Sequence, residues 1–401
     1  MPGARSRIAV IFFTVLIDLI GFGIVLPILP FDAQRFGVEG MGFGALVFIF
    51  SGMQFLSTAV LGRLSDRVGR RPILLTTMLL NAAGYLLFAF AASYPALFVA
   101  RLVSGFASGN ISAAQAYMAD ITSPAERSRG MGMIGAAFGL GFTLGPALGG
   151  LAHQWWGDAA PGLVAAGLSL INFVSAYFIL PESLRPEHRT VRPIFGLAHL
   201  GEALARPRLR PLMVVWAVAP FAFAGYTVAL PLFAAARLGW HEKELAWLFT
   251  LIGITAATVQ GGLFGRLAHR FGERALLVAG TFGMAVAIGV IPLLHTSASL
   301  YAWTFVLAVA NSAFAPAATG LVSVYADPTE QGSMLGAAQA FGALGRSFGP
   351  LAMGSVYDAL SPSTAFVVAA LGMAGAGLVA GRLEPVSSGP APREPGHASL
   401  P

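Results

Sequence analysis

The chain has 401 residues, of which 56% are hydrophobic and only 10% are charged, and its mean hydropathy is +0.74. A soluble protein of this length cannot bury so much apolar surface, so the composition indicates a membrane protein. The sequence holds no cysteine, which excludes disulfides, thiol catalysis and thiolate metal sites. The 7 histidines are scattered, so neither a metal site nor another cofactor is expected.

Breaker residues divide the chain into twelve apolar segments, each close to the ~20 residues that cross a bilayer as a helix. The stretch 275–326 holds no Asp, Glu, Lys or Arg and is divided at Pro292 and the polar residues that follow it. The sequence therefore predicts an all-α membrane protein with transmembrane helices at 8–29, 42–62, 72–92, 96–119, 131–152, 161–181, 211–235, 245–265, 275–294, 299–325, 333–357 and 363–382.

The basic residues predict the orientation, because short cytoplasmic loops of membrane proteins are rich in Lys and Arg. With the N-terminus inside, the outer loops hold only Arg35, Arg237 and Lys243, and two arginines lie within helices. Both termini are therefore expected in the cytoplasm. The protein is expected in the inner or plasma membrane of the cell. The inner segments hold Arg5, Arg7, Arg63, Arg67, Arg70, Arg71, Arg127, Arg129, Arg185, Arg189, Arg192, Arg206, Arg208, Arg210, Arg266, Arg270, Arg274, Arg382 and Arg393.

The two halves of the chain repeat each other. GRLSDRVGRR at 62–71 recurs as GRLAHRFGER at 265–274, and GFTLGPALGG at 141–150 recurs as GRSFGPLAMG at 345–354. Two parallel repeats predict two pseudo-symmetric six-helix bundles with a substrate cavity between them. We divide the chain into an N-terminal bundle at 1–181, a cytoplasmic loop at 182–210, a C-terminal bundle at 211–383 and a proline-rich disordered tail at 384–401.

The segment Gly62–Pro72, GRLSDRVGRRP, closely resembles the signature loop of the major facilitator superfamily of secondary transporters. The resemblance covers essentially the whole chain and implies the major facilitator fold, a small-molecule cargo and no enzymatic activity. Glycines at both ends of the loop permit a sharp turn, and Pro72 suits the first turn of a helix. The net charge of +6 is distributed over loops without stacking aromatics, so no nucleic-acid partner is expected.

The loop resemblance also implies a gate on the cytoplasmic side. Asp66 can receive the positive N-terminal end of a neighbouring helix, and the family resemblance points to the helix that begins near Ser333. Arg67 or Arg70 can pair with Asp120, which closes the two halves on the inside. Alternatively, the arginines anchor the loop at lipid headgroups. The gate residues named by this interpretation are Gly62, Asp66, Arg67, Gly69, Arg70, Arg71 and Asp120.

The second copy of the loop differs from the first in charge. His269 stands at the position of Asp66, and Glu273 stands at the position of Arg70. The sequence therefore predicts two unequal gates. A pH-sensing role for His269 competes with a plain solvated loop histidine.

A glycine-rich motif in the helix at 131–152 is similar to the antiporter motif of the family. Small residues let helix backbones approach closely, and proline kinks a helix. Tight packing against the helix at 245–265 would seal a leak path, and the resemblance implies exchange of substrate for protons. Simple helix packing is the alternative. The motif residues are Gly141, Gly145, Pro146, Gly149 and Gly150.

Asp18 and Arg101 are charges inside predicted membrane helices, where charge is costly and usually functional. The segment around Asp18 resembles the first helix of tetracycline/proton and multidrug/proton antiporters. We expect Asp18 to take up and release the proton, with Arg101 as its partner. A static structural ion pair is the alternative.

Arg346 lies about 20 Å into the helix at 333–357 at helical rise, too deep for easy snorkelling, so we expect it in the cavity. Other polar residues in charge-free helices are weaker candidates, since each can equally serve helix packing. They are Gln54, Asn110, Gln115, Tyr226, Gln260, Asn311 and Gln339.

The closest resemblance is to the tetracycline-resistance branch of the drug/proton antiporters, around AQAYMADITSPAERSRGMG. Those pumps carry an aspartate in their third helix, where this chain has Gly84, and an acid in their ninth, where this chain has none. Tetracycline itself is therefore in doubt, and the proton role falls on Asp18. We predict a monomeric proton-coupled exporter of amphipathic drugs or metabolites. An exporter of an organic anion or lipid-like metabolite and a non-transporting membrane receptor are the alternatives.

Overall fold

The computed structural model describes residues 4–123, 126–184, 198–327 and 330–384, and within these ranges it is built of helices without a strand. Eleven helical segments are long and apolar enough to cross a membrane. They are α1 (Ala4–Val25), α3 (Gly40–Val68), α4 (Arg70–Ala89), α5 with α6 (Tyr94–Ala107 and Ile111–Ile121), α7 (Arg127–Trp156), α8 (Ala160–Ile179), α10 (Arg210–Leu238), α11 with α12 (Glu242–Thr258 and Phe264–Phe271), α13 (Glu273–Val290), α14 (Ser297–Tyr325) and α16 (Pro362–Gly381).

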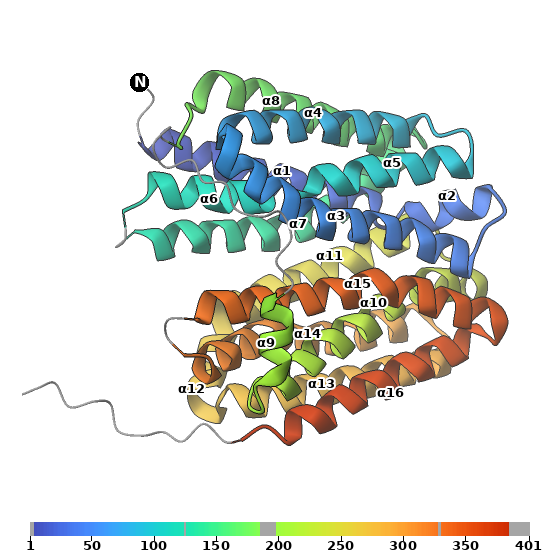
Figure 1. Cartoon of the computed structure of the whole chain (residues 1–401). Helices are drawn as coiled ribbons and strands as arrows, with labels where there is room; N and C mark the ends of the chain where they lie inside the picture. Colours follow the sequence, from blue (N-terminus) through green and yellow to red (C-terminus); the bar gives the residue numbers. More distant parts are fainter. Residues whose placement is uncertain (1–3, 124–125, 185–197, 328–329, 385–401) are drawn as a thin grey trace, which may run out of the picture.

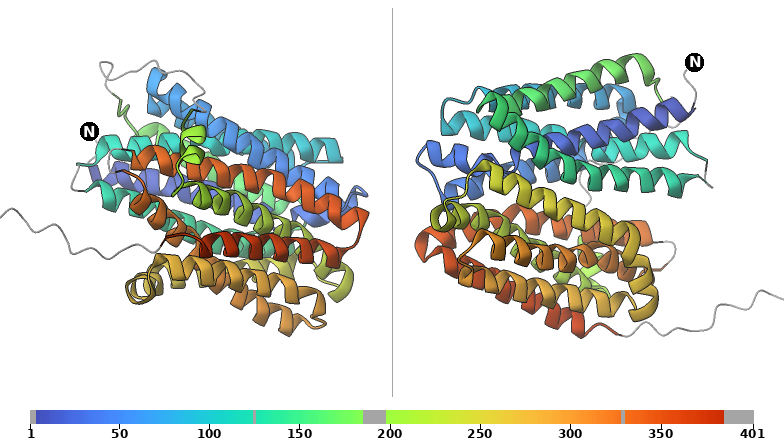
Figure 2. Two further views of the ribbon diagram at one scale, coloured as in Figure 1. Left: turned by 60° about the horizontal axis from the view of Figure 1, so that its bottom comes forward. Right: turned by 180° about the vertical axis from the view of Figure 1, so that it is seen from behind.

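A twelfth long helix, α15 (Gln331–Ala359), is less apolar because glycine, serine and glutamine fill much of it. It packs between α3, α10 and α16 in the centre of the molecule rather than against lipid alone. Helices α1 to α8 form one bundle and α10 to α16 the other, as the views of Figures 1 and 2 agree. The chain is an all-α, multi-pass membrane protein.

Several helix ends differ from those predicted. The first helix ends at Val25 instead of residue 29, because the chain turns before Pro27 and Pro30 and starts the short helix α2 (Leu29–Arg35). Helix α3 runs on to Val68, so most of the predicted inner loop is helical. The division of 275–326 at Pro292 is confirmed, since α13 and α14 flank that residue.

Breaks inside two helices follow from local sequence. A 3-10 turn at Ser108–Asn110 separates α5 from α6, where glycine lies between two short polar side chains. A π-helical turn at Val259–Leu263, which includes Gly261 and Gly262, separates α11 from α12. Both breaks lie within segments that the sequence predicted as continuous helices.

Among the described residues, the two halves pack together from one end of the molecule to about the middle of the helices. At the end we call outer, from the arginine distribution, the Met41 amide of α3 donates to Asp358 of α15 at 2.7 Å. A methyl group on Gly44 would overlap Pro350, and one on Gly150 would meet Ala246 of α11. Toward the inner end, a methyl group on Gly132 of α7 or on Gly336 of α15 would meet no atom within 4 Å. The described conformation is therefore closed outside and parted inside.

The loop between the bundles contains α9 (Ala198–Ala205), which packs against α10 and α15. Residues 185–197 of this loop and the predicted tail at 385–401 lie outside the described residues. The predicted boundaries at 181 and 210 coincide with the end of α8 and the start of α10 to within two residues.

Candidate functional site

Asp18 of α1 is buried within the N-terminal bundle, with 6% of its surface exposed. Its two carboxylate oxygens each accept a hydrogen bond from an amide, one from Asn81 Nδ2 at 3.1 Å and one from Asn110 Nδ2 at 2.6 Å. Asn110, expected in the cavity, is 1% exposed and is instead a ligand of this carboxylate. The site is therefore a buried acid held by two neutral amides.

Asn81 and Tyr85 of α4 complete the surroundings of Asp18, and sequence reasoning missed both. Asn81 Oδ1 and the Tyr85 hydroxyl are buried without a hydrogen-bond partner. Tyr85 packs on Gly21, one turn along α1 from Asp18, where a methyl group would overlap its ring. Asn81 and Tyr85 are four residues apart in the segment 78–89, which is otherwise apolar, so their position on one face of the helix was the available clue.

The predicted ion pair between Asp18 and Arg101 of α5 is not formed. The guanidinium carbon of Arg101 lies 4.0 Å from the ring centre of Phe50, a cation–π contact, and its Nε atom has no hydrogen-bond partner. Among the described residues, no ion pair joins Asp18 to Arg101. The charge is held by the aromatic face, because α3 approaches α5 closely at Gly105, where a methyl group would overlap Phe50.

At the inner end, Arg70 is the centre of the first gate. It is 8% exposed, forms an ion pair with Asp66, and places its Nε atom 3.4 Å from Asp120 Oδ2. Its Nη1 atom donates to the Ser65 hydroxyl at 2.6 Å. The expected approach of an arginine to Asp120 is therefore present, and Ser183 also donates to Asp120 at 2.9 Å.

The turn of this gate is a single residue, Gly69, with φ of 115°, a conformation that favours glycine. The predicted turn role of Gly62 is wrong, since Gly62 lies inside α3 and packs on Ser112. Glu182 accepts hydrogen bonds from the amides of Arg70 and Arg71 at 2.8 and 3.2 Å, and so caps the first turn of α4.

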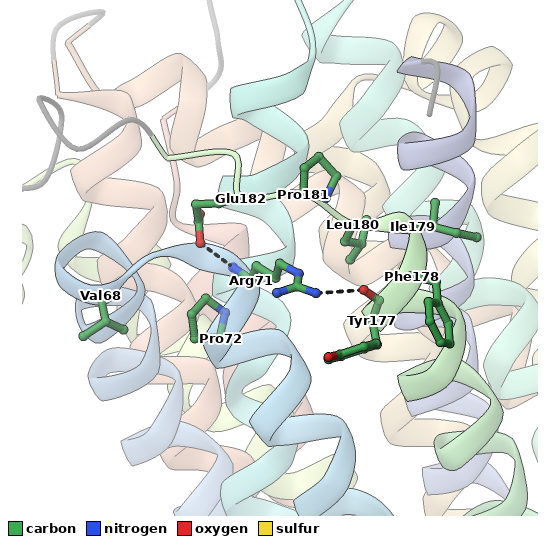
Figure 3. A pocket seen from close by; sticks show the side chains of 9 residues that line it. All are labelled: Val68, Arg71, Pro72, Tyr177, Phe178, Ile179, Leu180, Pro181 and Glu182. Carbon is green, nitrogen blue, oxygen red and sulfur yellow. Dashed lines mark hydrogen bonds between the residues drawn. The ribbon is translucent and has the colours of Figure 1, made fainter. Parts of the chain in front are cut away.

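Figure 3 shows Arg71 between this cap and the end of α8. Its guanidinium donates to the Tyr177 carbonyl at 2.7 Å, which satisfies one of the last carbonyls of that helix. The residues around Arg71 line a pocket of about 480 Å³ at the inner end of the bundle. Arg71 therefore connects α4 with α8.

The predicted contact between Asp66 and the first turn of α15 is not formed. Within the described residues, no hydrogen bond or ion pair joins Asp66 to that helix, and its charge is met by Arg70. The reason is the conformation, because the halves are parted at the inner end. The role of these residues in closing the inner gate remains a prediction.

The second gate is built from different residues. Glu273 is the first residue of α13, its carboxylate lies against Gly320 of α14, and Gly272 forms the turn with φ of 79°. Asp327, the counterpart of Asp120, pairs at 3.5 Å with Arg206, which also pairs with Glu330. The arginine missing from the second repeat is thus supplied by the loop that joins the bundles.

The antiporter-like motif of α7 packs chiefly on α1. Methyl groups on Gly141, Gly145 and Gly149 would overlap the backbone or side chains of α1 between Leu19 and Ile24. Pro146 lies against the same helix. Of the motif glycines, Gly150 faces α11, where Ala246 fills the space, and farther along α7 a methyl group on Gly253 of α11 would overlap Phe142 and Thr143, so α7 and α11 pack closely from the outer end to the middle of α7.

Arg346 of α15 lies in the middle of its helix and is nevertheless exposed. No hydrogen bond or ion pair involves it within the described part of the chain. Its guanidinium lies near Gly342 and Trp216, whose ring meets Phe314 edge to face at 5.6 Å between centroids. We call Arg346, Trp216 and Phe314 the cationic corner. The position of Arg346 in the space between the halves remains a prediction.

The remaining cavity candidates divide by exposure. Gln115, Gln260 and Gln339 are exposed, and Gln54 and Asn311 are half-buried. The prediction for Tyr226 is wrong, because it is fully buried within the C-terminal bundle beside Phe223. A tyrosine side chain can either fill the space between packed helices or line a cavity, and the sequence around Tyr226 does not distinguish the two.

Comparisons with known proteins agree with this architecture. A family model described as the Major Facilitator Superfamily matches residues 11–262 and 217–401. The chain is 31% identical to the bovine major facilitator superfamily domain-containing protein 10, over 87% of both chains. It is 30% identical to the class C tetracycline resistance protein of Escherichia coli, over 89% of this chain and 91% of the relative.

Among solved structures, that of the human organic anion transporter MFSD10 (TETRAN) superposes with a TM-score of 0.70 at 28% identity. The match covers 95% of this chain and 100% of the other.

Proposed function

The chain belongs to the Major Facilitator Superfamily of transporters, and from this premise we propose that it is a proton-coupled antiporter that exports small amphipathic organic compounds. The N-terminal bundle supplies the proton site, and the space between the bundles holds the cargo. Alternating access exposes that space to one side of the membrane at a time.

The observation that supports proton coupling best is the environment of Asp18. A buried carboxylate is stable only when hydrogen bonds or a counter-charge replace water, and here two amides do so without a cation. Asn81 Oδ1 has no partner, so a rotated amide can accept a hydrogen bond from the protonated acid. The site is thus able to hold either protonation state, which a carrier of protons requires.

A route from Asp18 to the interface runs along α1. The glycines of α7 pack on α1 between Leu19 and Ile24, next to Asp18, and Gly150 of the same helix touches α11 of the other bundle. A change in hydration or hydrogen bonding at Asp18 therefore acts on a helix that reaches the opposite half through one intermediate. Tightly packed small residues transmit such a shift because they leave no space to absorb it.

The cargo is proposed to bind at the cationic corner. Arg346 brings a positive charge without a partner, and the rings of Trp216 and Phe314 offer an apolar wall. This combination suits an amphipathic molecule with a carboxylate or another polar acceptor. An organic anion is accordingly the second candidate cargo, and the similarity to a human organic anion transporter supports it.

The proton role is tested in liposomes that contain purified protein and an imposed pH gradient. Fluorescein, an organic anion, and ethidium, an organic cation, serve as probes. We expect the gradient to drive uptake of at least one probe by the wild type, and Asp18→Asn to lose this response while still exchanging probe down its own gradient. Glu126→Gln, an exposed carboxyl-to-amide change, is the matched control and keeps the response. Wild-type coupling in Asp18→Asn would refute the proposal.

The cargo site is tested separately at Arg346. Arg346→Ala is expected to weaken fluorescein transport more than ethidium transport, and Arg346→Lys to restore part of the loss, because the charge rather than the planar fork attracts an anion. Equal transport of fluorescein by Arg346→Ala and the wild type removes the organic anion candidate.

A further inference from the structure

A group of ionisable side chains joins the two halves at their outer end. His153, in the last turn of α7, places its Nδ1 atom 3.7 Å from Asp158 Oδ1 of its own half. Its Nε2 atom lies 3.7 Å from Glu242 Oε2, at the start of α11 in the other half. The imidazole thus stands between two carboxylates of opposite halves, with 24% of its side chain exposed.

Two more charges adjoin this pair from α2. Arg35 lies 2.6 Å from Asp158 and 3.4 Å from Asp32. We call His153, Asp158, Glu242, Asp32 and Arg35 the outer charge cluster. With a neutral imidazole the cluster holds three carboxylates against one guanidinium, and it reaches neutrality when two protons are bound.

The other charged groups nearby are engaged or directed outward. On α11, Lys243 is exposed, and Glu244 accepts the His241 amide at 3.0 Å in the helix cap. The ring of His241 lies 6.4 Å from that of Phe31. None of these forms an ion pair with His153 within the described residues.

Asp32 adds a second titratable group. The pKa of its carboxyl is raised to about 7, chiefly by burial and also by the nearby charges of Asp158 and Glu242, which together outweigh the opposing effect of Arg35. When the halves separate at the outer end, Glu242 leaves and water enters, so the pKa of Asp32 falls toward its ordinary range. The closed arrangement therefore binds protons more tightly than the open one, and acid favours closure by linkage.

We infer that the outer charge cluster is a proton-binding site that holds the outer gate closed when protonated from outside. A charged imidazole attracts Asp158 and Glu242 together across the interface, whereas a neutral one leaves like charges facing each other. Histidine changes charge between pH 5 and 8, the range in which such a site responds.

This site goes beyond the proposed role of Asp18, because it lies in the interface rather than inside one bundle. In an exporter driven by inward proton flow, closure of the outer gate follows the release of cargo and the arrival of a proton. Protonation of the outer charge cluster favours that closure, and it does so without proton transfer to Asp18.

The absence of cysteine from the chain allows a direct measurement of the outer gate. Phe90 and Leu293 are 68% and 70% exposed, follow α4 and the end of α13, and lie in different halves. Spin labels on Phe90→Cys and Leu293→Cys report the distance between the outer ends by pulsed electron paramagnetic resonance. Asp18→Asn is included in every variant, so that titration of Asp18 does not contribute.

We expect the short-distance population to grow as the pH falls from 8 to 5, with a change in the closed-to-open ratio of roughly two- to fivefold, as for partly exposed ion pairs. His153→Gln and Glu242→Gln each remove most of this change. The matched control is His295→Gln, because His295 contacts Arg237 at 2.8 Å within one half, and it keeps the response.

Two results would overturn the inference. One is a pH response in His153→Gln equal to that of the parent, and the other is a parent whose distances do not change with pH. Size-exclusion profiles identify any variant that fails to fold, and His153→Asn then replaces His153→Gln. Since no transport is measured, either negative result leaves the proposed antiport through Asp18 untouched.

Discussion

The two inner gates occupy equivalent places in the repeats but are stabilised by different parts of the chain. In the first gate, Arg70 gathers Asp66 and Asp120 within one bundle. In the second, Glu273 replaces that arginine, and Arg206 pairs with Asp327 from outside the bundle. Duplication therefore preserved the turn geometry, while the charge that stabilises the end of the helix was replaced by one from the joining loop.

Other contacts did keep their symmetry. Arg71 donates to the Tyr177 carbonyl at the end of α8, and Arg274 donates to the Gly381 carbonyl at the end of α16, at 2.7 and 2.6 Å. In both cases an arginine at the start of one helix satisfies a carbonyl that has no partner within its own helix. Backbone carbonyls are present whatever the sequence, so this contact survives divergence better than a pair of side chains does.

The largest expected difference between the gates is at their centres. Arg70→Ala leaves Asp66 and Asp120 facing each other without the buried cation, and we expect a loss of about 2 kcal/mol of stability. Glu273→Ala, the matched change in the second gate, is expected to cost at most about 0.5 kcal/mol. Thermal unfolding of both variants in detergent measures the difference, and equal losses would contradict the asymmetry.

A smaller difference is expected at the two turn glycines. Both have positive φ, so alanine introduces strain of about 1–2 kcal/mol at either. At Gly69 the methyl group would also overlap Glu182, whereas at Gly272 it would meet no atom within 4 Å. Gly69→Ala should therefore lower the unfolding temperature more than Gly272→Ala, and the reverse order would show that the Glu182 cap is unimportant.

The cap itself gives the next prediction. Glu182→Gln keeps an acceptor for the amides of Arg70 and Arg71 but removes the charge at the start of α4. We expect a loss of about 1 kcal/mol, which falls as salt is added, because charge at a helix terminus is screened. A loss that does not depend on salt would point to hydrogen-bond geometry instead of charge.

The smallest effect is expected at Arg206. Its partners are largely exposed, so Arg206→Ala should cost only about 0.5 kcal/mol. Adding Glu273→Arg returns an arginine to the position that Arg70 occupies in the first gate, and should recover part of the loss in thermal unfolding. Additive losses in the double variant would show that the second gate cannot be rebuilt on the pattern of the first.

The sequence predicted the helices well because hydropathy and breakers act locally, and the repeat motifs located both of the charged turns at the inner end. It placed the end of α3 six residues early, since arginines and an aspartate in the last turns of a helix look like a loop. The Asp18–Arg101 pair failed for another reason. Opposite charges are the simplest partners for each other, but Asn81, Asn110 and Phe50 are supplied by helices whose rotation the sequence does not specify.

The length of helix α3 determines how far its inner end moves when the helix tilts. Gly40 touches α15 at one end of this helix, and Asp66 belongs to the gate at the other, 26 residues and about 39 Å away at helical rise. A tilt of about 10° around the glycine contact displaces Asp66 by about 7 Å relative to α15. Because Gly69 is the only residue between α3 and α4, the two helices swing together. A small rotation of α3 about its close backbone contact at the outer end therefore produces a large displacement of its inner end.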